Sequence, residues 1–491
     1  MAPLVLFLVA LGIRLATFLA FPEPAYPDAL YYANVARNVA AGSGLSVDYI
    51  WSFVEVGGVL PATGTLPIPA NAHWMPLAVL IQVPFLVLLG PGPLASGLPF
   101  WLLAAAAAPL TWAIARDAGL GRLQAACAGL LAAAPGLVLP YLAQPDNFAP
   151  YMLLGALALW LCGRALRGDR RAFLAGSAVV GLAFLSRNDG VLLAVPFLVV
   201  FLAGRRGHAG ARRIGWGTAI AGGALCLAIV APWLARQLLV FGSLSPSAAN
   251  GRILWIADYA ELFSIATPAS LSTFLAQGIG PILASRVGGL VAAVGILVAG
   301  PLLVVLAPCT AAGAWARRRD PRFLPWAVYT LTLLAFSGLL FAVHVPYGTF
   351  LHSVVAGLPH AFVLAIAGIG VLVGAVARRR RRWDAADATR VFTVALTGLA
   401  LLLAGAGTLR TLDAWRAEQA GRAAIIATLR ADPDPGRVMS PDPGAYRYHA
   451  ARTGIVTPDD PLPVIADALE RYGVRHLVIE RAHPVPALAP I

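Results

Sequence analysis

Residues 123–143 read LQAACAGLLAAAPGLVLPYLA, 21 consecutive residues without a charge. A helix of about 20 mainly apolar residues is long enough to cross the hydrocarbon core of a bilayer. Arg116 and Arg122 lie before this stretch, and the short polar turn Gln144-Pro145-Asp146 follows it. The stretch therefore predicts a membrane span with a basic end and an acidic end.

The composition of the whole chain supports the same interpretation. Hydrophobic residues make up 59% of the 491 residues and charged residues only 12%, with a mean hydropathy of +0.77. Soluble domains carry about 25% charged residues, so an ordinary globular enzyme is excluded. The net charge is +13, and all 36 basic residues are Arg, gathered in short clusters between apolar runs. This pattern is typical of cytoplasmic membrane anchors rather than of a nucleic-acid-binding face.

The Arg clusters predict the sidedness of the chain, because short Arg-rich loops stay in the cytoplasm. The segment His73–Leu89 is apolar, but as a span it would move every later basic loop to the outside. We therefore expect a juxtamembrane or re-entrant helix, which Pro76 and Pro84 favour. The five basic loops are Arg116–Arg122, Arg164–Arg171, Arg205–Arg213, Arg317–Arg322 and Arg378–Arg390. The eleven expected spans are 3–21, 95–115, 123–143, 147–163, 172–186, 190–204, 214–236, 287–314, 323–343, 352–376 and 391–409.

The predicted fold class is an all-α polytopic membrane protein with about 11 transmembrane helices, juxtamembrane helices and a small C-terminal α/β domain on the outer face. The transmembrane domain covers 1–410, with long outer loops at 22–74 and 237–286, and the outer domain covers 411–491. Ala2–Phe21 is expected to be a retained first helix, since it lacks a basic n-region. In the tail we expect helices at Asp413–Arg430 and Leu462–Tyr472 and strands at Arg437–Ser440, Gly454–Thr457 and Arg475–Glu480. No internal repeat is evident.

Ionisable side chains gather where the predicted spans meet the outer face. An ionisable group inside the membrane is a functional candidate by default, but all 23 acidic residues fall in loops, in the tail or at span ends, and none is expected at mid-bilayer. Asp28 lies in the first turn of an expected helix, so it is either an N-cap or a general base. Asp146 either caps a helix or has a catalytic or substrate-binding role. Arg187 beside Asp189 either forms an ion pair or binds phosphate. The other candidates at this depth are Asp48, Glu55, His73, Arg236, His344 and His352.

The order of short motifs resembles the GT-C superfamily of membrane glycosyltransferases, near the protein mannosyltransferase and aminoarabinose-transferase branch. The motifs are Tyr26-Pro27-Asp28 followed by Tyr31 and Tyr32, Asn71-Ala72-His73-Trp74-Met75-Pro76, Pro145-Asp146, Arg187, and Ala231-Pro232-Trp233 leading to Arg236. Those families commonly have His-Pro-Pro where this chain has His73-Trp74-Met75-Pro76. The resemblance covers most of residues 1–380 as an arrangement.

The resemblance implies an inverting transfer from a polyprenyl-phosphate sugar to an acceptor hydroxyl on a lipid, glycan or protein, at the outer membrane face. Asp28 and Asp146 would be the catalytic residues. The substrate-binding residues would be Tyr31, His73, Arg187, Asp189, Arg236, His344 and His352. No cofactor is expected with certainty; a divalent metal on Asp28, His73 and Asp146 is conceivable, but the spacing does not require one. The alternatives are a transporter or flippase of lipid-linked sugars, and an envelope polymer ligase or polymerase.

Overall fold

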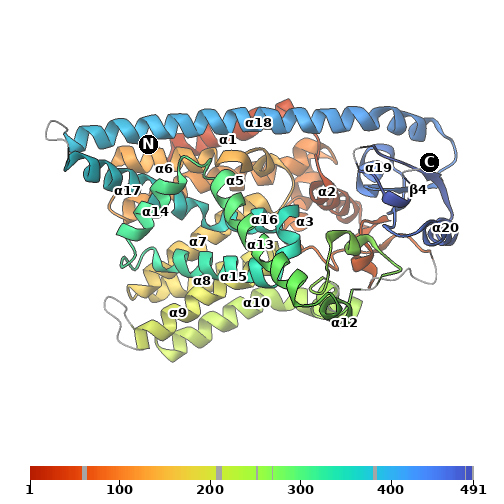
Figure 1. Ribbon diagram of the computed structural model, residues 1–491, viewed down its shortest axis with the longest axis horizontal. Coiled ribbons are helices and arrows are strands. Elements are labelled where there is room, and N and C mark those ends of the chain that lie inside the picture. The colour runs from red at the N-terminus through yellow and green to blue at the C-terminus, as the bar shows by residue number, and fades with distance from the viewer. Residues whose placement is uncertain are drawn as a thin grey trace. The chain divides into compact units, whose positions relative to one another are not determined.

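The computed structural model describes residues 1–57, 64–205, 213–249, 253–267, 269–379, 384–481 and 483–488. The basic loops Arg205–Arg213 and Arg378–Arg390 are thus described only in part. The chain divides into two compact units (Figure 1). Unit 1 comprises 1–21, 97–232 and 288–412, and unit 2 comprises 22–96, 233–287 and 413–491.

Unit 1 is built from apolar helices. Among the described residues, eight helices are long and apolar enough to cross a membrane, or nine if the bent pair Arg122–Ala133 and Gly136–Ala143 is one span. The chain is therefore a multi-pass membrane protein. The helices that contribute to this unit are α1 (Ala2–Ala20), α5 (Pro93–Asp117), α6 (Arg122–Ala133), α7 (Phe148–Leu166), α8 (Arg170–Ser186), α9 (Ala194–Arg205), α10 (Trp216–Phe241), α13 (Ile279–Ala299), α14 (Ala307–Ala316), α15 (Leu324–Leu339), α16 (Thr349–Val354), α17 (Leu358–Ala377) and α18 (Ala385–Ala431).

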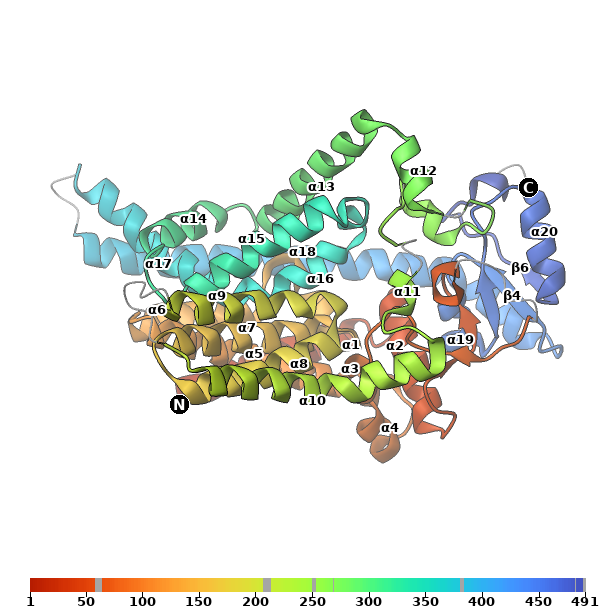
Figure 2. The ribbon, with the colours of Figure 1, turned by 90° about the horizontal axis from the view of Figure 1, so that it is seen from below.

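Small residues let the helices of unit 1 approach closely, as is usual in membrane bundles. Helices α14 and α17 cross where Gly313 faces the carbonyl of Leu364 and Gly368 faces the carbonyl of Cys309, and neither glycine has room for a Cβ atom. Helices α7, α8 and α9 pack against one another in the same way (Figure 2). On α8, the Cβ of any residue replacing Gly176 would collide with the ring of Phe197 on α9.

The expected span 287–314 is wrong as a single helix. Helix α13 ends at Ala299 and α14 begins at Ala307. Pro301 explains the break, because proline disfavours helical geometry at the preceding residue and lacks an N–H group. Leu303 and Val304 then adopt positive φ angles of 52° and 62°, which no continuous right-handed helix allows.

Unit 2 contains a four-stranded parallel sheet in the order β2 (Tyr49–Ile50), β5 (Gly454–Val456), β4 (Arg437–Ser440) and β6 (Val474–Leu477). Ile50, Met439 and Ile455 form its core with Ile465 of α20 (Leu462–Arg471). Figure 1 labels β4, α19 (Pro443–Ala450) and α20, and Figure 2 also labels β6. The sheet combines strands of the C-terminal tail with one strand from the segment between α2 and α3.

The remaining elements of unit 2 are short. In the His73–Leu89 region the structure has α3 (Leu77–Leu80) and α4 (Val83–Leu89), and the two together are shorter than a membrane span. The other elements are α2 (Pro27–Ala40), β1 (Ser46–Val47), β3 (Ile68–Pro69), α11 (Pro246–Ala249), α12 (Leu271–Ala276) and the 3-10 turns η1 (Phe53–Val56), η5 (Tyr259–Phe263) and η8 (Pro486–Leu488).

Candidate active site

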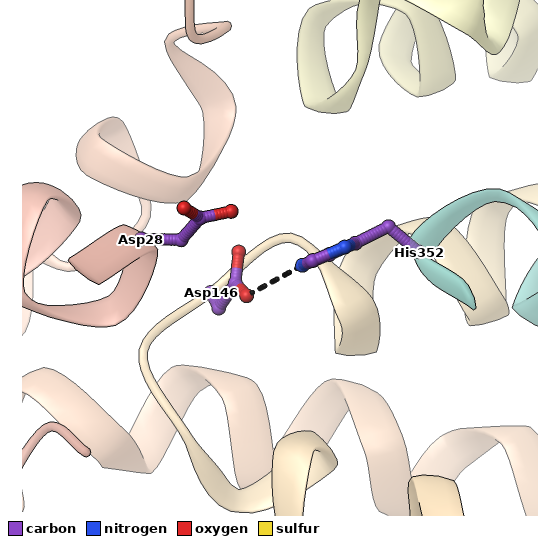
Figure 3. Close-up of side chains that lie close together, drawn as sticks. All are labelled: Asp28, Asp146 and His352. Carbon is purple, nitrogen blue, oxygen red and sulfur yellow. Dashed lines mark hydrogen bonds and ion pairs between the residues drawn. The ribbon is translucent and has the colours of Figure 1, made fainter. Parts of the chain in front are cut away.

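A buried carboxylate and an imidazole form the centre of the candidate site in unit 1. Asp146 lies in the turn before α7 and has no solvent-exposed surface. Its Oδ2 atom is 3.1 Å from Nε2 of His352 on α16 (Figure 3). The ring of Phe148 stacks on the imidazole with centroids 3.9 Å apart, which fixes the plane of the ring.

The two nitrogens of His352 both face oxygen acceptors. Nδ1 is 2.9 Å from the carbonyl oxygen of Gly348, and Nε2 faces Asp146. A neutral imidazole has one N–H and can donate to only one of these oxygens. The second contact requires a further proton, on either the imidazole or the carboxyl group, or a bound cation in its place. The pair is therefore suited to holding a proton or positive charge at a fixed position.

A second pair of charged side chains is attached to the same short helix. Arg187, which ends α8, binds Asp189 through Nε to Oδ1 at 2.9 Å and Nη2 to Oδ2 at 3.2 Å. Arg187 Nη2 also lies 3.2 Å from Oγ of Ser353, whose hydroxyl donates to Asp189. Adjacent residues of α16 thus bind two different aspartates. We call Asp146, Arg187, Asp189, His352 and Ser353 the Asp146 cluster.

Tyrosines fix the backbone beneath this cluster. The hydroxyl of Tyr329 donates to the carbonyl oxygen of Ser353 at 2.8 Å, and the hydroxyl of Tyr151 lies 3.1 Å from that of Tyr329. Neither tyrosine nor Ser353 was among the residues that the sequence singled out. Tyrosines within apolar helices give no signal of their own, although Ser353 follows His352 directly in the chain.

An apolar cavity of about 420 Å³ lies between α8, α9 and α10 in unit 1. Its lining includes Phe184, three residues before Arg187, and Val191, two residues after Asp189. One end of the cavity is therefore next to the turn that carries this ion pair. Phe173 on α8 and Phe201 on α9 lie further along the cavity, towards the opposite ends of these helices.

Unit 2 carries Asp28 in the first turn of α2. The helix is capped at Tyr26 by backbone geometry alone, without a side-chain hydrogen bond. Asp28 is thus not the N-cap, and α7 likewise has Asn147, not Asp146, at its N-cap position. Capping was the structural alternative to a chemical role for both aspartates, and Asp146 keeps a related structural contact, because its Oδ1 accepts from the backbone N–H of Asn147.

A hydrogen-bonded network in unit 2 holds the turn that precedes His73. Tyr31 donates to Oε1 of Glu55 at 2.6 Å and accepts from the backbone N–H of Asn71 at 2.7 Å. Gln237 donates to the carbonyl oxygen of Asn71 at 2.8 Å, and Arg236 donates to that of Ala70 at 2.8 Å. We call Tyr31, Glu55, Asn71, Arg236 and Gln237 the Tyr31 network.

Burial controls the protonation of Glu55. The carboxyl is 5% exposed, and this desolvation raises its pKa to about 8, although hydrogen bonds from Tyr31 and Trp51 act in the opposite direction. Glu55 is therefore mainly protonated at neutral pH. Burial, strengthened by the nearby Glu55, also raises the pKa of Tyr31 well above its ordinary value.

The structure distributes the predicted site residues over both units. In unit 1 it joins Asp146 to His352 and Arg187 to Asp189, whereas His344 packs against Phe341 with ring centroids 5.5 Å apart. In unit 2, Tyr31 and Arg236 belong to one network, and the ring of His73 lies 5.6 Å from that of Trp51. Asp48, a weaker candidate, pairs with Arg447 at 3.0 Å.

Comparison with known proteins gives one partial sequence match and several similar folds. The sequence model of the dolichyl-phosphate-mannose-protein mannosyltransferase family matches residues 73–235. No curated protein matches the sequence. The fold is similar to that of the *Archaeoglobus fulgidus* oligosaccharyltransferase, with a TM-score of 0.60 and 14% identity over 97% of this chain and 69% of that one.

A second structural relative is ArnT from *Cupriavidus metallidurans*, whose structure was determined with bound undecaprenyl phosphate. Its TM-score is 0.52, with 16% identity over 96% of this chain and 89% of that chain. The archaeal oligosaccharyltransferase is also known in complex with zinc and sulfate, with a TM-score of 0.54 and 14% identity over 93% of this chain and 62% of that chain. The chain therefore shares the fold of these two membrane transferases, and residues 73–235 match the mannosyltransferase family.

Proposed function

We propose that this glycosyltransferase moves a sugar, with inversion, from a polyprenyl-phosphate donor to an acceptor hydroxyl at the outer membrane face. The observation that carries the proposal is the Asp146–His352 pair, in which both imidazole nitrogens face oxygen atoms. A donor of this class has a tail that stays in the membrane and a phosphate at the interface. The Arg-rich loops, expected in the cytoplasm, favour the opposite face for the site.

The reaction assigns a separate task to each group. Asp28 takes the proton of the acceptor hydroxyl, whose oxygen attacks the anomeric carbon of the sugar. The bond between that carbon and the phosphate oxygen breaks, and polyprenyl phosphate leaves with the bonding electrons. His352, held by Asp146, and Arg187 stabilise the developing phosphate charge, an effect worth roughly 3–4 kcal/mol per well-placed donor.

The remaining assignments concern binding. Asp189 orients Arg187, because its carboxylate binds two nitrogens of the guanidinium group. The apolar cavity between α8, α9 and α10 would hold part of the polyprenyl tail, since one end lies next to Arg187. ArnT was crystallised with such a lipid, undecaprenyl phosphate. Further proposed substrate contacts are Tyr31, His73, Arg236 and His344.

A divalent metal fits part of this arrangement. A carboxylate oxygen and an imidazole nitrogen are suitable ligands for zinc or manganese, and neighbouring ligand atoms around such an ion lie roughly 3 Å apart. Asp146 Oδ2 and His352 Nε2 are separated by 3.1 Å. These two residues would hold the ion, which would supply positive charge for the leaving phosphate. The metal content of purified wild type and of His352→Gln tests whether these residues hold a metal. Wild type should contain the bound ion, and the variant should lack it.

The test of the function is mass spectrometry of purified protein in membranes supplied with a panel of polyprenyl-phosphate sugars. Wild type and the control Arg378→Gln, an exposed residue after α17, should release free polyprenyl phosphate, and Asp28→Asn should not. Donor binding by a folded wild type without turnover of any donor would contradict the proposal and favour a carrier of lipid-linked sugars. Equal loss in Asp28→Asn and Arg378→Gln would show that the site is misplaced.

A further inference from the structure

We propose that the C-terminal segment 437–456 positions helix α2, and with it Asp28, so that the tail is a required part of the catalytic apparatus although it supplies no reacting group. This inference rests on the proposed function, which assigns the proton transfer to Asp28. It concerns unit 2 alone. The residues that carry it are on α2, β2 and α19.

The polar contacts between α2 and the tail lie on two successive turns of the helix. Asn34 donates to the carbonyl oxygen of Gly444 at 3.0 Å. One turn further along, the guanidinium of Arg37 lies over the ring of Tyr448, 3.8 Å from its centroid. Cation–π contacts of this kind are attractive within about 6 Å of the centroid. Figure 1 shows α19, the helix that carries Gly444 and Tyr448, beside α2.

The loop after α2 is attached to the same segment. Asn38 donates to Oδ2 of Asp48 at 2.8 Å, and that oxygen also accepts from Arg447 at 3.0 Å. Strand β2 then pairs in parallel with β5, with Tyr49 opposite Gly454. Helix α2 and the strand that follows it are thus both held by the tail.

The fit between α19 and the first outer loop is tight. A Cβ atom at Gly444 would lie 2.9 Å from the hydroxyl oxygen of Tyr49, and Asn34 contacts both that hydroxyl and Gly444. A larger residue at position 444 must move α19, Tyr49 or both. The joint therefore transmits small displacements of the tail to α2.

The geometry of a helix converts such a displacement into a movement of Asp28. Asp28 lies nine residues before Arg37, which is about 13 Å along an α-helix. A tilt of roughly 10° about the Arg37 end therefore moves Asp28 by roughly 2 Å. A misplacement of about 1 Å at a reacting group can reduce the rate by about 100-fold. Loss of the contacts with the tail should therefore lower kcat.

The test compares two substitutions of Tyr448. Tyr448→Leu removes the ring and should lower kcat about 10- to 100-fold, with KM for the donor changed less than about twofold. Tyr448→Phe keeps the ring over Arg37 and should retain most of the activity. The matched control is Arg471→Ala on α20, whose salt bridge to Asp467 is exposed, and it should leave kcat unchanged.

Asn34→Ala is a second and milder probe of the same joint, for use if Tyr448→Leu does not yield folded protein. An unchanged kcat in folded Tyr448→Leu would overturn the inference. If Tyr448→Leu does not fold, an unchanged kcat in Asn34→Ala would overturn it. Equal losses of kcat in Tyr448→Leu and Tyr448→Phe would also overturn it. Asp28→Asn, measured alongside, separates the two hypotheses. If Asp28→Asn is fully active, the proposed function itself fails; if it is inactive while Tyr448→Leu keeps its kcat, only the positioning role fails.

Discussion

The Asp146 cluster of unit 1 and the Tyr31 network of unit 2 are both buried and hydrogen-bonded, but they differ in charge and in what they bind. The first joins two carboxylates to a guanidinium and an imidazole, mainly through side chains. The second contains a carboxyl group that is mainly protonated at neutral pH. The Arg236 and Gln237 side chains of this network donate to backbone carbonyl oxygens.

This difference indicates different tasks. Paired charges in a site of low dielectric can stabilise charge that develops during a reaction, whereas hydrogen bonds to the backbone fix a turn. Substitutions in the Asp146 cluster should therefore mainly reduce kcat. Substitution of Glu55, which has no proposed contact with substrate, should mainly change stability.

The largest expected effect is that of Asp146→Asn. The amide keeps the shape of the side chain but removes the charge that pairs with His352. We expect kcat to fall at least 1,000-fold, within the range of lost acid–base and electrostatic catalysis. Donor turnover measured by mass spectrometry checks this, with Asp387→Asn, an exposed carboxylate of α18, as the control. Full activity of Asp146→Asn would remove this cluster from the reaction.

His352→Gln should have the next largest effect, a loss of kcat of about 100- to 1,000-fold. Glutamine can still donate one hydrogen bond but cannot carry positive charge. His483→Gln is the matched control, because this imidazole is largely exposed in the tail. If both variants lost activity equally, a specific role for His352 would be contradicted. Turnover of the same donor is the measurement.

Ser353→Ala should reduce kcat about tenfold, because Arg187 and Asp189 would lose one of their contacts with α16. Hydrogen bonds to charged groups contribute about 1.5–3 kcal/mol. The conservative Ser353→Thr keeps the hydroxyl and should retain more activity than alanine. Steady-state kinetics of the two variants decide this, and an alanine variant as active as wild type would exclude a positioning role.

Substitution of Glu55 should change the stability of the protein rather than the rate of transfer. Burial raises its pKa from 4.5 to about 8, so the native state binds a proton that the unfolded chain releases above its own pKa. Stability should therefore fall as the pH rises from about 4.5 to about 8. Glu55→Gln, which cannot ionise, should reduce this dependence.

Thermal unfolding in detergent at about pH 5.5 and about pH 8 tests the prediction. The difference in melting temperature between Glu55→Gln and wild type should shift in favour of the variant from about pH 5.5 to about pH 8. Arg471→Ala serves as the control and should show no such difference. An identical pH dependence in Glu55→Gln and wild type would mean that the native Glu55 is ionised.

The smallest effect is expected for Ala219→Trp, which places a large ring in the apolar cavity of unit 1. If the donor tail lies there, KM should rise about 5- to 10-fold for a long-chain donor, since buried apolar contact is lost. KM for a short-chain analogue should change little. Equal KM changes for both donors would contradict this position of the tail.

The sequence predicted the multi-pass membrane fold because apolar runs and Arg-rich loops are local features, and its short motifs carried the resemblance to GT-C proteins. It also placed β4 at the residues where the structure has it. It did not predict strand β2 or helix α19. A two-residue strand has no periodicity, and α19 begins with Pro443-Gly444, a pair typical of turns.

The candidate site was predictable only in part, for a similar reason. The sequence singled out Asp146, Arg187, Asp189 and His352, because charged residues at the ends of apolar helices stand out. It gave no pairing between residues as distant as Asp146 and His352, and it missed Ser353. The Tyr31 network depends largely on backbone carbonyl groups, which a sequence does not distinguish.

The most direct test of the two clusters measures kcat and the melting temperature for Asp146→Asn and Glu55→Gln in the same membrane preparation. We expect Asp146→Asn to lose transfer while its melting temperature stays close to that of wild type. We expect Glu55→Gln to keep kcat within about threefold, because amide and protonated carboxyl can both accept the bond from Tyr31. Equal loss of transfer in both variants, or loss only in Glu55→Gln, would contradict the division of tasks between the two clusters.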